Sequence, residues 1–381
     1  MKCHFTSILL LATGLAACTS GVQSGTTSAA DSTAVDTIAV VEPERPLLVG
    51  DSVINKAARF YAGISHEGAA LNVTQQGQWD GYARKMESAM EASRKTTDPM
   101  DTLMAKDMAD LREKCDFVFY PFSGPDFLYP ITLFPDADTY FMAGLEWTGR
   151  PLTEIVPDAQ HYQRYTGALD VYMRSSFFRT KSMDKDLDNE AIDGTVPVIS
   201  MLMALRGYEV ISVTYKTWTD EGGMADAAEV TKLAEIRFFH PSTPRHEQVL
   251  YYLSDDLSDS KFDERVGRFM ATTLPRHFTV TFFKAASYLL HQTWFTKMRD
   301  HVARYSNAII GDDSGMPYRF IKDDYDVTLY GKYQRPIKLF GDHDYQRDLQ
   351  QLYDSTEVRP LPFRIGYNRI SNWMVARKKG M

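Results

Sequence analysis

The stretch VPVISMLMALRGYEVISVT, residues 196–214, determines the fold class. Its first half, up to Leu205, is apolar on nearly every side, which is typical of a helix buried all round. Gly207 suits the left-handed position that ends a helix. From Tyr208 to Thr214 the residues alternate in polarity, which predicts a β-strand. A buried helix followed at once by a strand indicates helices packed on a sheet.

Working outward from this stretch, the same patterns predict one large α+β domain over residues 47–381, with Asp51 as the cap of its first helix. We predict helices over 51–61, 78–93, 101–114, 152–183, 196–205, 262–271, 294–306 and 345–353. We predict strands over 116–120, 139–146, 208–214, 232–239, 248–253, 277–283, 308–310, 327–330 and 337–340. Residues 121–138 read as an ordered loop between two strands, and 232–253 as a hairpin.

The N-terminal segment has the pattern of an export signal. Lys2 precedes the apolar run 8–12, and Leu15-Ala16-Ala17-Cys18 follows. These last four residues resemble the lipobox of bacterial lipoproteins, which implies cleavage before Cys18 and lipid on that cysteine. Residues 1–17 are then a signal peptide, and the Ser/Thr/Ala-rich residues 18–46 a flexible tether. Because Thr19 is not the aspartate that resembles an inner-membrane retention signal, the outer membrane is favoured.

Charge and cysteine content narrow the possible partners. The chain carries 42 basic and 50 acidic side chains, a formal net charge of −8, which opposes binding to nucleic acid. Of its three cysteines, Cys3 lies in the signal and Cys18 is the predicted lipid site. Cys115 therefore has no partner for a disulfide, and its apolar neighbours at 117–119 predict a small buried side chain.

The segment Ile309–Arg319 is the most suggestive of chemistry, because a predicted strand leads to Asp312, Asp313 and Ser314 in a tight turn. Strand then Asp-Ser-Gly resembles the loops of aspartic proteases, but these need two such loops and the chain has one. A serine nucleophile would need Gly-x-Ser-x-Gly, and Asp312 stands at the first glycine position. A turn whose Asp and Ser side chains bond local backbone is the third interpretation.

Other cofactor patterns are missing from the sequence. The nine histidines form no His-Glu-x-x-His, there is no Cys-x-x-Cys, and no glycine-rich phosphate-binding motif occurs. We therefore expect no metal and no nucleotide or other cofactor.

Two loops rich in acidic and aromatic residues are the candidate binding sites, namely 122–127 and 312–320. A flat ring beside hydrogen-bonding acids suits a sugar face or a peptide. The candidate binding residues are Ser123, Asp126, Glu146, Tyr318 and Arg319.

Residues 120–126 and 312–319 also resemble segments of exported proteins of Gram-negative bacteria, a resemblance that implies no activity. Taken together, the sequence predicts a lipid-anchored protein of the bacterial envelope, with no catalytic constellation, that binds a glycan, peptide or protein partner. The alternative is a hydrolase that uses Asp312, Asp313 or Ser314.

Overall fold

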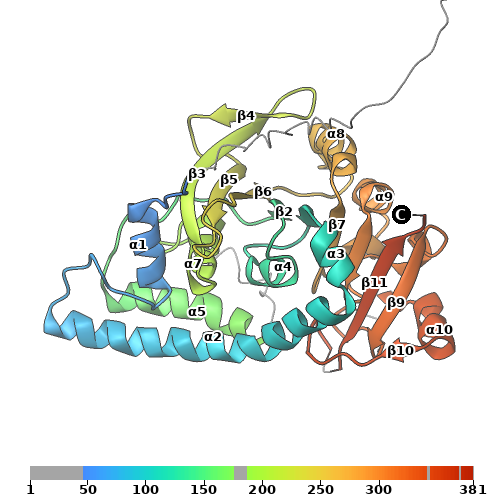
Figure 1. Cartoon of the computed structure of the whole chain (residues 1–381), viewed down its shortest axis with the longest axis horizontal. Helices are drawn as coiled ribbons and strands as arrows, with labels where there is room; N and C mark the ends of the chain where they lie inside the picture. Colours follow the sequence, from blue (N-terminus) through green and yellow to red (C-terminus); the bar gives the residue numbers. More distant parts are fainter. Residues whose placement is uncertain (1–45, 176–186, 341–343, 369, 381) are drawn as a thin grey trace, which may run out of the picture. The chain divides into compact units, whose positions relative to one another are not determined.

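The computed structural model describes residues 46–175, 187–340, 344–368 and 370–380. Within these residues it shows one α+β domain built on a mixed 11-stranded sheet, which confirms the predicted fold class (Figure 1). The predicted signal peptide 1–17, Cys18 and all but the last residue of the tether lie outside the described residues.

The centre of the sheet is parallel. Its strand order is β10-β9-β11-β8-β7-β1-β2-β6-β5-β3-β4, and β8, β7, β1, β2 and β6 all run in the same direction. After β1, the chain forms β2 and then β3 to β6 on one side of β1, and it places β7 and β8 on the other side. The point where the strand order reverses therefore lies between β1 and β7, and open parallel sheets bind ligands at such a point.

The strands and helices have the following bounds. The strands are β1 (Phe117–Tyr120), β2 (Thr139–Gly144), β3 (Glu209–Trp218), β4 (Met224–Ala227), β5 (Leu233–Phe239), β6 (Gln248–Ser254), β7 (Thr279–Phe283), β8 (Ala308–Gly311), β9 (Tyr325–Gly331), β10 (Val358–Arg359) and β11 (Asn372–Lys378). The α-helices are α1 (Ser52–Tyr61), α2 (Val73–Asp107), α3 (Ala109–Lys114), α4 (Leu128–Leu133), α5 (Ala159–Ser175), α7 (Thr195–Leu205), α8 (Glu264–Thr273), α9 (Thr296–Tyr305) and α10 (Arg347–Ser355).

Apolar side chains cover both faces of the sheet. Along β1, Val118 and Tyr120 pack with α1, α2, α4, α5 and α7, whereas Phe117 and Phe119 belong to a second core with α8, α9 and α10. This alternation follows from the two-residue repeat of a strand. A parallel sheet must be covered on both sides because its crossover connections place helices there.

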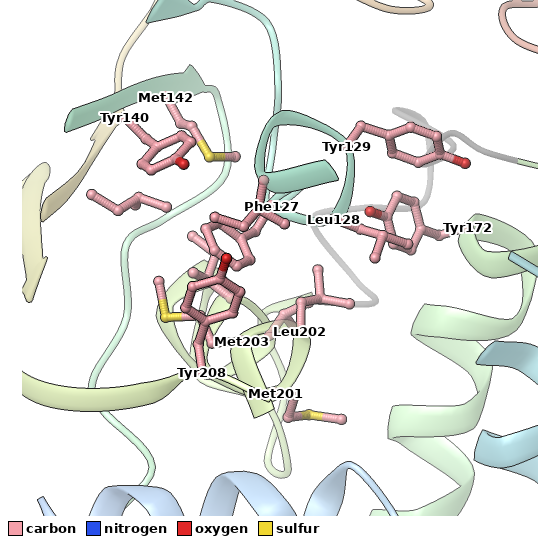
Figure 2. Close-up of a cluster of buried hydrophobic side chains, with 14 of the residues drawn as sticks. Phe127, Leu128, Tyr129, Tyr140, Met142, Tyr172, Met201, Leu202, Met203 and Tyr208 are labelled. Carbon is pink, nitrogen blue, oxygen red and sulfur yellow. The ribbon is translucent and has the colours of Figure 1, made fainter. Parts of the chain in front are cut away.

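The stretch that predicted the fold class behaves as expected. In α7 every residue from Thr195 to Met203 is buried, Gly207 adopts φ 81°, and β3 follows. Figure 2 shows Met203 and Tyr208 packed around Phe127, which comes from the loop after β1. The Phe127 ring meets that of Tyr208 edge-on at 6.1 Å. The predicted hairpin is confirmed as well, because β5 and β6 pair antiparallel.

The prediction that residues 78–93 and 101–114 form two helices separated by a break at 94–100 is wrong. One helix, α2, runs for 35 residues and passes through Pro99. Asn72 and Gln75 form a reciprocal capping box at its start. Proline removes one backbone hydrogen bond, to the carbonyl of Lys95, and Lys95 is exposed, so water can satisfy that carbonyl.

Other differences concern short elements. The connection 121–138 contains the helix α4, the helix predicted from 152 begins at Ala159, and its predicted end at 176–183 lies outside the described residues. Residues 337–340 form a turn where we predicted a strand. Strand β11 was not predicted, although it pairs with both β8 and β9.

We predict that Gly311→Ala destabilises the fold by about 2 kcal/mol. A Cβ there would lie 2.6 Å from the carbonyl oxygen of Phe283 and 2.8 Å from its Cβ, so β7 and β8 would have to separate. Gly167→Ala is the matched control, since its Cβ meets nothing within 4 Å in helix α5, where alanine stabilises by about 1 kcal/mol. Urea unfolding measures both; equal effects would contradict the prediction.

Candidate functional site

A cavity of about 160 Å³ lies at the carboxyl ends of the parallel strands, where the strand order reverses. Loops that follow four of these strands form its wall, together with Phe295 just before α9. The lining residues are Tyr120, Phe122, Ser123, Gly124, Asp126, Gly144, Leu145, Glu146, Asp255, Asp256, Leu257, Lys284, Ala285, Ala286, Ser287, Leu289 and Phe295. The strand order and the position of the cavity therefore indicate the same location for a ligand site.

A buried ion pair lies in this wall. Lys284, the first residue after β7, places Nζ 2.5 Å from Oδ2 of Asp126, and the two side chains are 1% and 3% exposed. The hydroxyls of Tyr120 (2.7 Å) and Tyr172 (2.5 Å) donate to the same carboxylate. The Lys284 ammonium also lies 3.5 Å from the ring centre of Tyr129, a cation–π contact. Figure 2 shows Tyr129 and Tyr172 beside one another.

Burial shifts the pKa values of Asp126 and Lys284 in opposite directions. It raises the pKa of Asp126, and the attraction of Lys284 and the tyrosine hydrogen bonds oppose that rise. It lowers the pKa of Lys284, against the attraction of Asp126. The ionised and the proton-transferred forms of the pair are therefore closer in free energy than they would be in water.

The backbone is strained on both sides of the cavity. Phe122, Ala285, Ser287 and Tyr288 adopt φ between 50° and 61°, a region that residues other than glycine rarely occupy. Each such residue costs about 1–3 kcal/mol, and such strain gathers at functional sites. The strain therefore supports a functional role for the loop after β1 and the loop after β7.

The turn after β8 holds the strained loop in place. Asp312 accepts the N–H of Ala285 (3.2 Å), and Oγ of Ser314 accepts the N–H of Ala286 (2.8 Å). The Ser314 hydroxyl in turn donates to Oδ1 of Asp312 (2.6 Å). Burial, with the neighbouring charge of Asp313, raises the pKa of Asp312 to about 7.

Asp313 faces different partners. It accepts the hydroxyl of Tyr288 (2.6 Å) and the side-chain amide of Asn372 (2.5 Å). Burial raises its pKa, and these two hydrogen bonds oppose the rise. Asp313 is thus held by residues that are distant along the chain.

The structure separates the predicted site residues into three groups. Ser123, Asp126 and Glu146 line the cavity. Asp312, Asp313 and Ser314 are buried next to the loop that lines it, and they are outside the lining among the described residues. Tyr318 and Arg319 start a short 3-10 helix away from the lining, where the Arg319 guanidinium stacks on Phe320.

Sequence reasoning missed Lys284 and the residues that surround it. A lysine directly after the apolar strand TVTFF (279–283) is a usable signal, because a charge at the end of a buried parallel strand lies where ligands bind. Tyr172 offers no comparable signal, since it lies within an ordinary helical stripe. Its contact with Asp126 spans 46 positions along the chain.

Cys115 and the clustering of possible metal ligands can be assessed within the described residues. Cys115 is buried, as predicted, and burial raises the pKa of its thiol. Across the described ranges, no three His, Cys, Asp or Glu side chains gather as a metal site would require.

We predict that the stability of the protein depends on pH through Asp312. Its pKa is about 7 in the folded state and about 3.9 when unfolded, so the folded state binds the extra proton. The stabilisation that comes from this bound proton is fully present below about pH 4 and is lost as the pH rises through about 7. Asp312→Asn should therefore gain stability relative to the original chain as the pH rises from 4 to 8. Urea unfolding at several pH values measures this, and parallel curves would contradict it.

No family model, no curated protein and no solved structure matches the chain. Among the described residues, no helix has both the length and the apolar character needed to cross a membrane.

Proposed function

We propose that the chain is a lipid-anchored protein of the bacterial envelope, held through Cys18, that binds the terminal sugar ring of a glycan in the cavity. The cavity itself carries the proposal, because it combines an apolar wall with several hydrogen-bond acceptors at a strand-order reversal. The lipobox-like residues 15–18 support the anchor, and the outer membrane is the favoured location.

The apolar part of the wall suits one face of a ring. Phe122 and Phe295 meet edge to face with ring centres 5.5 Å apart, and Leu257 and Leu289 extend this surface. A cavity of roughly 150 Å³ can hold a benzene-sized group. A volume of about 160 Å³ therefore matches a single six-membered ring.

The polar part of the wall favours a ligand that donates hydrogen bonds. Glu146, Asp255 and Asp256 line the cavity, and each carboxylate has about four acceptor positions. Tyr252 donates a hydrogen bond to Glu146 at 3.3 Å, and Lys232 donates one to Asp255 at 3.1 Å. Among the described residues of the lining, Lys284 is the one cation, and it is paired with Asp126. Hydroxyl groups suit this wall better than a phosphate or carboxylate would.

The hydrolase alternative is supported by one observation. Ser314 and Asp312 are 2.6 Å apart, within the reach that proton transfer needs, and the pKa of Asp312 is raised to about 7. However, Ser314 is fully buried, and its Oγ accepts the N–H of Ala286. These contacts serve to hold the loop after β7, and binding is therefore the function we favour.

We predict that the detergent-solubilised full chain binds a subset of glycans on an array, and that Glu146→Gln weakens binding about tenfold. Loss of one charge-assisted hydrogen bond costs roughly 1.5 kcal/mol or more. Glu154→Gln, at an exposed position outside the cavity lining, is the matched control and should bind like the original chain. Calorimetry with the best glycan measures both variants. Absence of any glycan binding, or equal effects, would contradict the proposal; capture of peptides instead would favour a peptide ligand.

The anchor is tested separately. When the chain is expressed in a Gram-negative host supplied with labelled palmitate, we expect label on the original chain and on Cys115→Ala, and none on Cys18→Ala. The buried position of Cys115 makes it the matched control. Label that persists after loss of Cys18 would refute lipidation there.

A further inference from the structure

The Lys284–Asp126 pair is not explained by stability. Removing two charges from water is expensive, and buried pairs can often be replaced by apolar residues at no loss of stability. The proposed glycan binding does not use the pair either, because that proposal relies on the acceptors at Glu146, Asp255 and Asp256. Yet both members of the pair line the cavity, and the strained residue Ala285 directly follows the lysine.

We propose that Nζ of Lys284 forms an imine with the carbonyl carbon of an aldehyde or ketone that enters the cavity, with Asp126 as the group that takes up and returns the proton. Lysine amines buried beside an acid are suited to this chemistry because a neutral amine is the nucleophile. The ligand class is thus a small carbonyl compound.

Formation of the imine needs no reactant besides Lys284, Asp126 and the carbonyl compound. The Lys284 ammonium first passes a proton to Asp126 across 2.5 Å. The amine lone pair then forms a C–N bond, and the carbonyl oxygen receives the proton from Asp126. The nitrogen, now positively charged, returns a proton to Asp126, which protonates the new hydroxyl group. Water leaves as the nitrogen lone pair forms the C=N bond, so that an ammonium and a carbonyl become a protonated imine and one water.

The surroundings favour each of these transfers. Asp126 ends ionised and again faces a cation, so the buried charges are matched before and after the reaction. The hydroxyls of Tyr120 and Tyr172 keep the carboxylate in position. The face of Tyr129 stabilises positive charge on the nitrogen. Burial lowers the pKa of Lys284 and raises that of Asp126, which makes the first proton transfer easier than it is in water.

The test is reductive trapping on the full chain. Glycolaldehyde, glyceraldehyde, pyruvate and dihydroxyacetone are each incubated with the protein and sodium cyanoborohydride, which reduces an imine to a stable secondary amine. Peptide mapping by mass spectrometry then gives the labelling rate of each lysine. With at least one of these compounds we expect Lys284 to be labelled at least tenfold faster than the exposed Lys56. Labelling of Lys284 no faster than Lys56 with all four would overturn the proposal.

Two variants separate the roles of the pair. Lys284→Arg should abolish labelling at this position and leave labelling of Lys56 unchanged. Asp126→Asn should slow labelling of Lys284 at least tenfold, because the proton acceptor is lost; circular dichroism checks that each variant is folded. Should either variant unfold, the rates in the original chain still decide the question. The glycan proposal does not depend on this reaction, so a failure of trapping leaves the result of the glycan array intact.

Discussion

The pairing of β1 with β2 on one side and β7 on the other is the constraint on which the rest of the structure depends. Both pairings are parallel, so each requires a long connection that crosses a face of the sheet. These connections supply α4 on one face and, through α8, a helix on the other. Because the parallel strands all end at the same edge, their following loops converge there and enclose the cavity.

The elements with strong local patterns could be predicted from the sequence. Helix α7 and strand β3 combine a clear polarity pattern with a glycine stop, and β5 and β6 are joined by a turn-rich segment. Strand β11 was missed because Arg377 and Lys378 make its end look like a polar tail. Its residues Trp373 and Val375 nevertheless pack on one face of the sheet, and Met374 and Ala376 on the other. Such burial depends on neighbours distant in the chain.

The candidate site was predictable only in part, for a similar reason. A loop of unusual composition identified Ser123 and Asp126, and the end of a predicted strand supplied Glu146; all three line the cavity. The partner of Asp126 could not be identified in this way, since Lys284 stands more than 150 positions later in the sequence. Strain at Ala285 and Ser287 likewise leaves no mark on residue type. The loop is held by hydrogen bonds that the N–H groups of Ala285 and Ala286 donate to the turn after β8.

The distance along the chain between Asp126 and Lys284 also bears on the order of folding. Contacts between remote segments form late, because closing a long loop costs conformational entropy before any contact is gained. During synthesis, a chain that has passed residue 126 but not yet reached residue 284 contains the Asp126 carboxylate without its cation. A carboxylate in that state favours contact with water, which opposes burial of the region around the future cavity until β7 has been made. We therefore expect the cavity to be among the last parts of the domain to close, after β7 and β8 have been synthesised.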